Sequence, residues 1–451
     1  MSTKAPRTGR LARGAIAGLA VARAGAAQLS HHVQALTRSP EQAEQTEQAR
    51  LAHQAKLGRI LFAALNQLKG TALKASQLLS LELGLLPEGM REELAKAHYQ
   101  VTPLNRALVI KLLRQEFGQG PDDLFAQFEP SAFAAASLGQ VHGATLASGE
   151  AVAVKLQYPG MAASIGSDMA MLRTLLQTFA RGSDSLPKAD IVERVLVDIE
   201  AKLAEELDYH REAEQLQWFA QALAGRPGLV LPRTFAHLSS KRVLTMQRLL
   251  GMHLNEWLAT EPSQAERDHF GQLLFDTFLF SLFELRRLQA DPHPGNYLFM
   301  AEGRLGLLDF GCTKQLSEKF CVGISGAWSA MLCQPCDLDR LQQIYLELGL
   351  IAASLSKADF REQLMPALAE TLAWQTAPFA VAVYDFGQHP VMPRPDPAQQ
   401  RLAVNFLQAV TPELPYFDRA YLGLVLMLKS LGARVRTSNQ WIGPSTTAPT
   451  P

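Results

Sequence analysis

The N-terminal part of the chain shows helical spacing of its apolar residues. Residues 41–57 are polar and rich in Gln and Ala, which is typical of a solvated helix or a linker. From residue 60 to residue 79, apolar side chains recur every three or four positions, which is the period of an amphipathic helix. A further helix is predicted over 103–117, and the Gly/Pro turn at 118–121 marks a candidate boundary. We therefore expect a helical region before the first strands.

An alternating pattern then predicts a β-hairpin. The segment 130–159 contains short alternating runs on either side of a turn at Ser148-Gly149. Because side chains on a strand alternate between its two faces, Lys155 shares a face with Ala153 and Gln157. A lysine among small residues on a strand suits a phosphate contact, although an ordinary exposed strand lysine has the same pattern.

A long amphipathic helix is expected over 191–219, with acidic residues opposite its apolar stripe. At about 100° per residue, Asp208 and Glu212 lie about 40° apart around the helix axis, whereas Glu206 lies about 200° from Asp208. A single straight helix therefore does not direct Glu206 and Asp208 at one partner. These acids fit either a solvated helix face or a binding site.

The rest of the chain is predicted to continue with two strands and then mainly with helices. The strands are expected at 229–235 and 242–250, around a Ser-Ser turn. The next helix, 269–288, is apolar on nearly every face. Its polar exceptions are Gln272, Asp276 and Glu284. They favour a buried helix of a globular lobe over a membrane span.

The most informative residues lie in a Pro/Gly loop and at the end of the strand after it. Asp291 and Asn296 are five positions apart, and Asp309 follows 13 positions later, directly before Phe310-Gly311. This matches the D-x4-N and D-F-G spacing of protein-kinase catalytic loops. Phosphoryl transfer needs a carboxylate near the attacking group, and it needs an amide oxygen and a second carboxylate to hold Mg²⁺ on the nucleotide phosphates. We therefore predict that Asp291 is catalytic and that Asn296 and Asp309 bind magnesium.

With these residues the sequence resembles the UbiB/AarF family, the atypical protein-kinase-like proteins associated with ubiquinone biosynthesis. The resemblance covers roughly residues 60–330. VAVKLQYPG is similar to the segment that carries the family's nucleotide lysine, which implies that role for Lys155. EELDYHREA resembles the family's E-x-D signature. The resemblance implies that Glu212 pairs with Lys155 and that Glu206 and Asp208 are the signature acids.

Two nucleotide-binding segments follow from the same resemblance. FAAASLGQVHGA is similar to the Ala-rich loop that stands where typical kinases have a glycine-rich loop. The nucleotide contacts implied in it are Ala135, Ala136, Ser137, Leu138, Gly139, Gln140 and Val141. The hinge between the lobes is placed at Met246, Gln247, Arg248 and Leu249, whose backbone is expected to bond adenine. The implied cofactors are ATP or ADP, with Mg²⁺.

The resemblance also implies an N-terminal regulatory element. LKGTALKASQLLS resembles the family's K-x-G-Q element, in which Lys74 and Gln77 match and Ser76 replaces glycine. Lys74 and Gln77 are three positions apart and so share a helix face. In the family this helix folds over the active site, and its lysine meets the E-x-D acids. No A-P-E signature follows Asp309, which also argues against phosphorylation of proteins.

The charge distribution separates the N-terminus from the rest of the chain. Lys plus Arg and Asp plus Glu both number 43 among 451 residues, so the net charge is zero, which argues against a nucleic-acid-binding protein. The first 40 residues hold six basic residues and no acid. Such an arm fits a surface that touches anionic lipid, a solvated disordered arm or an organellar transit peptide.

Cysteine usage adds one weak candidate. Four cysteines in a chain of this length exclude a disulfide scaffold. Cys333 and Cys336 form a single C-x-x-C motif, but metal sites usually need a second pair. Helical packing is therefore favoured over a redox or metal role.

These patterns and the resemblance together predict an α+β fold, namely a protein-kinase-like bilobal fold with an N-terminal helical extension. The hydrophobic fraction, 47%, is typical of a globular protein. The expected domains are a basic arm (1–40), a helical extension with the K-x-G-Q-like element (41–120), an N-lobe (121–250), a helical C-lobe (251–437) and a disordered tail (438–451).

Two classes of function remain open. The first is an atypical kinase with Mg²⁺-dependent ATPase or small-molecule kinase activity that supports isoprenoid-quinone biosynthesis or lipid homeostasis. The second is a nucleotide-gated pseudokinase scaffold that binds lipid-biosynthesis proteins with negligible turnover. The expected location is cytoplasmic and peripheral on the inner membrane, or mitochondrial or plastid if the arm is a transit peptide. Expected partners are a nucleotide, a lipid surface and quinone-biosynthesis proteins, but no nucleic acid.

Overall fold

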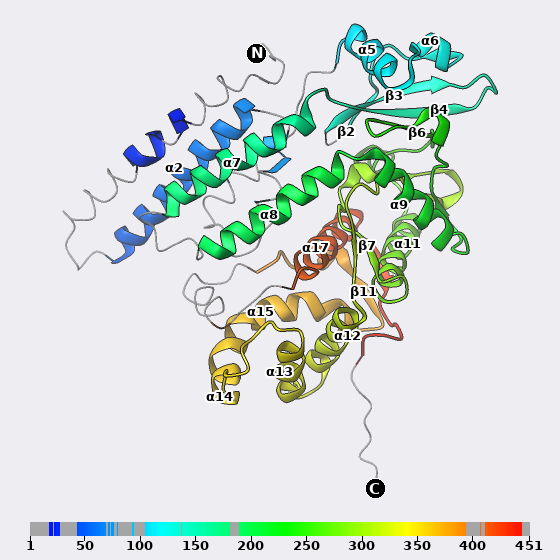
Figure 1. The fold of residues 1–451 in the computed structure, drawn as a ribbon. Coiled ribbons are helices and arrows are strands. Elements are labelled where there is room, and N and C mark those ends of the chain that lie inside the picture. The colour runs from blue at the N-terminus through cyan, green and yellow to red at the C-terminus, as the bar shows by residue number, and fades with distance from the viewer. Residues whose placement is uncertain are drawn as a thin grey trace. The chain divides into compact units, whose positions relative to one another are not determined.

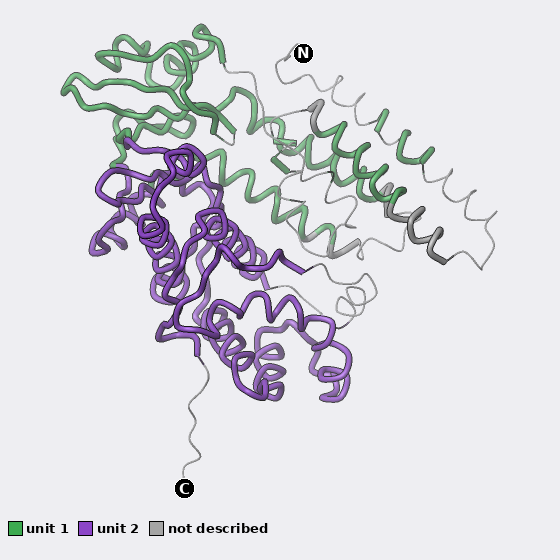
Figure 2. Tube along the Cα trace, turned by 180° about the vertical axis from the view of Figure 1, so that it is seen from behind, with its two compact units in different colours: residues 1–214, 233–248 green, residues 215–232, 249–451 purple. Residues whose placement is uncertain are grey.

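The computed structural model describes most of the chain from residue 104 onward and shorter stretches before it. The described residues are 18–20, 22–27, 43–68, 71–72, 74–75, 79, 93, 104–136, 138–180, 189–393, 406 and 411–443. The chain divides into two compact units (Figure 2): unit 1 comprises residues 1–214 and 233–248, and unit 2 comprises 215–232 and 249–451. Each unit has its own hydrophobic core.

Unit 1 contains a layer of long helices (Figure 1). They include α2 (Ala43–Leu68), α7 (Met161–Ala180) and α8 (Ala189–Glu206). The apolar stripes of these helices bury one shared core. The described part of the basic arm is also helical, and it adds three buried residues to this core, Ala20, Ala24 and Ala27. The helical period that begins at residue 60 is observed in α2, which also includes the polar stretch before it.

The other part of unit 1 is a five-stranded antiparallel sheet. The predicted hairpin is confirmed, because β3 (Gly139–Thr145) and β4 (Ala151–Gln157) pair along their whole length. The strand order is β1-β3-β4-β6, and β2 pairs with β3. The remaining strands are β1 (Gln127–Phe128), β2 (Ala134–Ala136) and β6 (Val243–Gln247). Lys155 therefore lies on a central strand.

Helix α5 (Arg106–Phe117) covers the sheet and is followed by the short α6 (Pro121–Leu124). The side chain of Asn105 caps the first turn of α5 by accepting the N–H of Leu108. Gly118 ends the helix with a φ of 73°, a conformation that glycine adopts without a steric penalty. Apolar residues of α5 and β4 share a second core, which includes Val109, Leu112, Leu113, Val152, Val154 and Leu156.

The single helix predicted over 191–219 is wrong, because the chain forms two helices there. α8 ends at Glu206, and α9 (Tyr209–Ala222) begins after two intervening residues. The carboxylate of Asp208 accepts the N–H of His210 at 3.1 Å. Aspartate is favoured at such a position because its side-chain oxygen satisfies an N–H that has no partner in the first turn. Because of this break, Glu206 and Asp208 do not have to point in opposite directions, as they would on one straight helix.

The strand pair predicted at 229–235 and 242–250 forms only in part. β5 (Leu229–Val230) belongs to unit 2 and pairs in parallel with another strand of that unit instead of with β6. Residues 233–235 do hydrogen-bond to β6. Pro232 lies between these two stretches, and proline has no N–H to continue a ladder.

Unit 2 is mainly helical, with short strands around the predicted catalytic loop. Its helices are α10 (Leu254–Leu258), α11 (Gln264–Phe283), α12 (Glu318–Leu332), α13 (Leu338–Glu347), α14 (Lys357–Asp359), α15 (Met365–Thr376) and α17 (Leu414–Leu431). Besides β5, its strands are β7 (Arg287–Gln289), β8 (Tyr297–Phe299), β9 (Leu305–Leu307), β10 (Thr313–Gln315), β11 (Val383–Asp385) and β12 (Arg434–Arg436). β9 lies between β5 and β8, and β7 pairs with β10.

Helix α11 confirms the buried helix predicted over 269–288, although it begins at residue 264 and ends at residue 283. Ser263 and Glu266 form a capping box at its start, in which each side chain accepts an N–H from the other residue. Much of its length is buried, including Phe270, Leu274, Phe275, Phe278 and Leu282. Among the described residues, no helix has the length and apolar character needed to cross a membrane.

The fold continues past the predicted start of the tail at residue 438. Trp441 stacks on Phe283, with ring centroids 5.3 Å apart, and Ile442 is buried. The hydroxyl of Ser325 donates to the backbone carbonyl of Trp441. Residues 438–443 are therefore part of unit 2, and residues 444–451 lie outside the described residues.

Candidate functional site

In unit 1 the structure brings Lys155 and Glu212 together, as predicted. Nζ of Lys155 donates to both carboxylate oxygens of Glu212, at 2.7 and 2.9 Å. Lys155 is 5% exposed and Glu212 is 4% exposed. Lys155 comes from β4, and Glu212 comes from the first turn of α9, so the helix break at residues 207–208 helps to place the glutamate.

An aromatic ring also lies beside the Lys155–Glu212 pair. The ring centroid of Tyr209 lies 5.1 Å from Nζ of Lys155, within the range of a cation–π interaction. Removing two charges from water is costly, and a buried ion pair is often no more stable than apolar residues of similar size. Its presence is therefore better explained by a function than by the stability of the fold.

A second buried pair joins Lys74 to Glu206, with Nζ and Oε1 3.1 Å apart. Lys74 is 5% exposed and Glu206, the last residue of α8, is 8% exposed. The segment before Lys74 is also attached to α7, because the hydroxyl of Thr71 bonds to the side chains of Ser164 and Asp168. Ser76 and Gln77 of the predicted regulatory element lie outside the described residues.

The Ala-rich loop forms a tight turn between β2 and β3. Gly139 is required there, because a Cβ on it would lie 2.2 Å from the carbonyl oxygen of Leu156. The side chain of Leu138 belongs to the helical core of unit 1. Any nucleotide contact from these two residues would therefore be made by the backbone. Ala135 and Ala136 pair with Gln140 and Gly139 across the turn, whereas Ser137 lies outside the described residues.

Gln140 is buried, and its side chain makes internal contacts. Its amide oxygen accepts the N–H of Leu104 at 2.7 Å, and its amide nitrogen lies 2.6 Å from Nε2 of His142. Burial lowers the pKa of His142, whose other ring nitrogen lies 2.9 Å from the carbonyl oxygen of Glu129. These contacts make Gln140 and His142 a structural support of the loop. Val141, the last predicted loop contact, pairs with Lys155 across the sheet.

The predicted hinge differs from expectation in its hydrogen bonding. The N–H of Gln247 donates to the carbonyl of Arg233 at 2.8 Å, and the N–H of Arg248 donates to Ala151 at 3.0 Å. Met246 is buried in β6. The sheet therefore uses two of the backbone donors that we expected to bond adenine. Leu249, the last residue of the predicted hinge, is the first residue of its stretch in unit 2.

In unit 2 the three predicted active-site residues lie in and beside one loop. Asp291 and Asn296 lie between β7 and β8, and Asp309 follows β9, which pairs with β8. The side-chain N–H of Asn296 donates to the carbonyl of Asp291 at 2.8 Å. Oδ1 of Asp309 accepts the N–H of Gly311 at 2.9 Å. The loop thus orients the amide of Asn296 through the backbone of Asp291.

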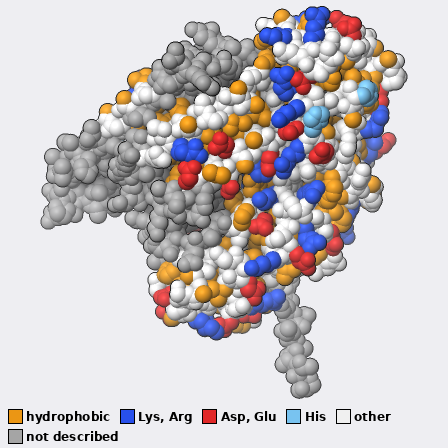
Figure 3. All heavy atoms as spheres, in the orientation of Figure 1, with side chains coloured by type: hydrophobic (Ala, Val, Ile, Leu, Met, Phe, Trp, Pro, Cys, Tyr) orange, Lys and Arg blue, Asp and Glu red, His pale blue; other side chains and the backbone are white. Residues whose placement is uncertain are grey.

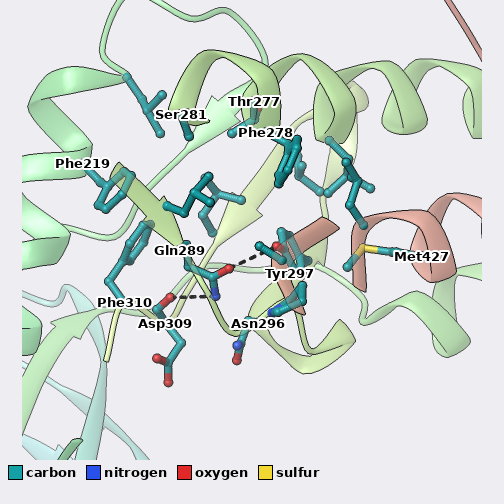
Figure 4. A pocket seen from close by; sticks show the side chains of 18 residues that line it. Phe219, Thr277, Phe278, Ser281, Gln289, Asn296, Tyr297, Asp309, Phe310 and Met427 are labelled. Atoms are coloured by element: carbon teal, nitrogen blue, oxygen red, sulfur yellow. Dashed lines mark hydrogen bonds between the residues drawn. The ribbon is translucent and has the colours of Figure 1, made fainter. Parts of the chain in front are cut away.

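Sequence reasoning missed Gln289, which connects the two parts of this site. Its side-chain N–H donates to the carbonyl of Asp291 at 2.7 Å and to the carbonyl of Asp309 at 3.3 Å. Its amide oxygen accepts the hydroxyl of Tyr297 at 3.4 Å, and Figure 4 shows Gln289 between Asp309 and Tyr297. Burial and the charge of Asp291 raise the pKa of Tyr297. The sequence signal that could have identified Gln289 is its position two residues before Asp291.

Sequence reasoning also missed Arg419, which forms an ion pair with Asp291. The two residues are 128 positions apart, and α17, which carries Arg419, follows a segment that showed no motif. No local pattern links such a pair, so only the folded structure identifies it.

The side chains at the loop fit a magnesium ion that is also held by nucleotide phosphates. Mg²⁺ usually takes one or two carboxylates from the protein and completes its shell with water and phosphate oxygens. Asn296 and Asp309 offer oxygen ligands, and Figure 4 shows both side chains extending from the loop in the same direction, away from the apolar lining. The described residues contain no group of three or more His, Cys, Asp or Glu side chains that could hold a metal without a nucleotide.

Unit 2 also contains an apolar cavity of about 60 Å³ (Figure 4). Its walls come from α11, α17, β9 and the loop, and they include Leu274, Phe278, Leu307, Leu424 and Met427. Asn296, Asp309 and Gln289 lie at its polar side. The predicted catalytic loop therefore forms part of the wall of this cavity.

The C-x-x-C pair follows the end of α12. The thiol of Cys333 donates to the carbonyl of Ser329, and the thiol of Cys336 lies 3.7 Å from the sulfur of Met331. Both cysteines are free of disulfides, and burial raises the pKa of the Cys336 thiol. These contacts fit the packing role that the sequence favours.

Known proteins show the same domain. The ABC1 atypical kinase-like domain matches residues 96–344, which is more than half of the chain. The mitochondrial atypical kinase COQ8 of Saccharomyces cerevisiae is 31% identical over 257 residues, which are 56% of this chain and 50% of that protein. The mitochondrial atypical kinase COQ8B of Rattus norvegicus is 35% identical over 254 residues, which are 56% and 47% of the two chains. The chain belongs to the UbiB/AarF family.

The chain spans about half the length of these UbiB/AarF relatives. A solved structure with the same fold is Rv3197 of Mycobacterium tuberculosis, determined with erythromycin. It aligns with a TM-score of 0.60 and 24% identity, covering 88% of this chain and 96% of that one. The predicted family and the α+β protein-kinase-like fold are both confirmed. The individual site roles stay predictions.

Proposed function

We propose that this UbiB/AarF protein binds ATP or ADP with Mg²⁺ and acts as an ATPase or a small-molecule kinase. The observation that carries the proposal is the loop of unit 2, where Gln289 holds the backbones of Asp291 and Asp309. Asn296 is oriented by the same loop. A scaffold without turnover has less need of all three functional side chains in this spacing.

The residues divide the chemistry between them. Lys155, held by Glu212, is proposed to contact the nucleotide phosphates. Asp291 is proposed to orient the attacking hydroxyl or water, and Asn296 and Asp309 are proposed to hold Mg²⁺. When bound, the ion neutralises charge on the phosphates. The loop backbone at Gly139 is proposed to lie close to the nucleotide.

We further propose that the helix carrying Lys74 regulates the site. Lys74 forms a buried ion pair with Glu206. Thr71, three positions earlier, donates a hydrogen bond to Asp168 of α7. A helix held in this way is a fixed part of unit 1. This supports a role in restricting access, which agrees with the missing A-P-E signature and with a substrate smaller than a protein.

The biological setting is proposed from the relatives. Those named above are mitochondrial atypical kinases, and the family resemblance points to isoprenoid-quinone biosynthesis or lipid homeostasis. The basic arm of residues 1–40 is proposed to reach an anionic membrane surface or to address the protein to an organelle. Quinone-biosynthesis proteins are the proposed partners. We propose no nucleic-acid partner, because the net charge of the chain is zero. On the face drawn in Figure 3, basic and acidic side chains are interspersed.

The second candidate is a nucleotide-gated scaffold with negligible turnover. It is favoured by the buried Lys74–Glu206 contact, because a regulatory element fixed in this way suits a protein that responds to a nucleotide without consuming it.

Hydrolysis of ATP by the full chain separates the two candidates. We expect Mg²⁺-dependent turnover that rises when anionic liposomes or a quinone-precursor mimic are added. Nucleotide binding without turnover under all of these conditions would support the scaffold instead. Flotation of the chain on the same liposomes, with and without residues 1–40, tests the membrane proposal, because loss of the arm should reduce binding.

A further inference from the structure

The ion pair between Arg419 and Asp291 connects helix α17 to the catalytic loop within unit 2. A guanidinium N–H of Arg419 donates to Oδ1 of Asp291. The side chain of Arg419 is 15% exposed and that of Asp291 is 24% exposed. Charges at this depth are screened less by water and salt than those of a surface pair. The pair therefore constrains Asp291 more than an exposed ion pair would.

A second contact between α17 and the loop lies one helical turn further on. Gly423 lies beside Pro292, and a Cβ on Gly423 would be 2.0 Å from Cγ of the proline. Glycine inside a helix is destabilising relative to alanine, because its backbone loses more freedom on folding. Its presence here allows the helix backbone to touch the loop. Arg419 and Gly423 are four positions apart, so they lie on the same face of α17.

Helix α17 is a fixed part of unit 2. Its buried residues are Phe417, Ala420, Tyr421, Leu424, Val425, Met427, Leu428 and Leu431. Phe417 and Tyr421 pack on aromatic rings of α11 and α12. Moving such a helix would expose much apolar surface, so the contact with Asp291 is a permanent support and not a detachable latch.

We propose that Arg419 is a positioning residue for Asp291, and that Gly423 sets the distance at which it acts. The guanidinium holds the carboxylate in one rotamer while Gly423 lets the loop backbone rest on α17. This inference rests on the proposed function, because it assigns Asp291 to the reacting group. Misplacing such a carboxylate by about 1 Å is enough to cost on the order of 100-fold in rate.

The test compares turnover and nucleotide binding in Arg419→Gln, Arg419→Lys and Gly423→Ala variants of the full chain. We expect Arg419→Gln to lower kcat at least tenfold while KM for ATP with Mg²⁺ changes less than about twofold. Arg419→Lys should restore part of kcat, since it keeps the charge but loses the planar fork. Gly423→Ala should lower kcat in the same way, because its methyl group displaces Pro292.

Two matched variants control for general damage. Arg361→Gln removes an arginine from an exposed pair with Asp339, and Gly166→Ala adds a methyl group to a helix where no atom lies within 4 Å. Both should leave kcat unchanged. The double variant Arg419→Gln/Gly423→Ala should resemble either single variant, because residues that act as a unit are not additive.

Amide hydrogen exchange provides a readout that does not depend on turnover. Exchange across residues 291–297 should become faster in Arg419→Gln and Gly423→Ala, but not in Arg361→Gln. If Arg419→Gln does not fold, Arg419→Lys and Gly423→Ala make the same comparison. A chain that neither binds nor hydrolyses nucleotide contradicts the proposed function, whereas unchanged exchange in both variants overturns the positioning role. An unchanged or increased kcat in Arg419→Gln, or an effect on KM alone, also overturns it.

Discussion

Unit 1 contains two buried lysine–glutamate pairs that are alike in geometry but differ in the segments they join. The N–O distance is 2.7 Å in Lys155–Glu212 and 3.1 Å in Lys74–Glu206. All four residues are at most 8% exposed. Lys155–Glu212 joins a central strand to α9, whereas Lys74–Glu206 joins the N-terminal helical region to the end of α8.

Burial and N–O distance are similar in the two pairs, so these quantities do not distinguish the roles that we propose for them. The two glutamates are six positions apart, and the helix break at residues 207–208 lies between them. The break allows neighbouring acids to serve different elements. Because both pairs are buried to a similar degree, similar losses of stability are expected when either is broken. Their effects on turnover should differ.

The largest effect is expected for Lys155→Ala, which should reduce ATP turnover by about 100-fold or more, because the nucleotide phosphates lose a positioned positive charge. It should also destabilise the protein by about 3–5 kcal/mol, since Glu212 stays buried but loses the positive charge of Lys155. Steady-state kinetics and urea unfolding measure the two effects. Lys155→Ala/Glu212→Ala should recover part of the stability but none of the turnover, and recovery of turnover would contradict the proposed role.

A smaller effect is expected for Gln289→Leu, which extends the comparison to an uncharged contact in unit 2. It removes the donor that bonds the carbonyls of Asp291 and Asp309 while keeping a side chain of similar size. We expect kcat to fall about tenfold, since both backbones lose a shared support. Gln264→Leu, which changes an exposed glutamine on α11, is the matched control. Equal activity of the two variants would contradict the proposal that Gln289 supports the site.

Lys74→Ala should change activity less than Lys155→Ala, although its loss of stability should be similar. We expect a several-fold change in nucleotide affinity, or the appearance of self-phosphorylation, with turnover retained. Nucleotide titration and incorporation of labelled phosphate measure this outcome. The regulatory role would be contradicted if both quantities stayed at their original values in a folded Lys74→Ala protein.

The smallest effect is expected for Cys333→Ser/Cys336→Ser. Both thiols make only weak packing contacts, so stability should change by less than about 1 kcal/mol and turnover should not change. Kinetics in the presence and absence of a thiol reductant check the result. A loss of activity that matches the effect of oxidising the original protein would establish a redox role instead.

Features that depend on local spacing were predictable from the sequence. The hairpin around Ser148-Gly149 follows from the alternating pattern, and the buried helix α11 follows from a long apolar stretch with few polar exceptions. Lys155 and Glu212 were paired through the family resemblance, and the structure places them in contact. The helix break at residues 207–208 was not predicted, because Asp208 fits a helix face as well as a cap.

Features that depend on distant contacts were not predictable. Arg419 has no motif and meets Asp291 only through the packing of α17. β5 pairs with β9 and not with β6, which was its predicted partner. Tertiary contacts select the partner of a strand, and the periodicity of its residues does not specify it. The burial of Trp441 and Ile442 likewise arises from their docking on unit 2, although their composition resembled a tail.

The most direct test of the proposed function is calorimetric titration of ATP into the full chain, with Mg²⁺ and with EDTA. We predict that Mg²⁺ strengthens binding in the original protein and that Asp309→Asn abolishes this dependence. Asp339→Asn, which changes an exposed aspartate of unit 2, should retain it. If Asp309→Asn binds ATP with the original Mg²⁺ dependence, the assignment of the magnesium site is contradicted.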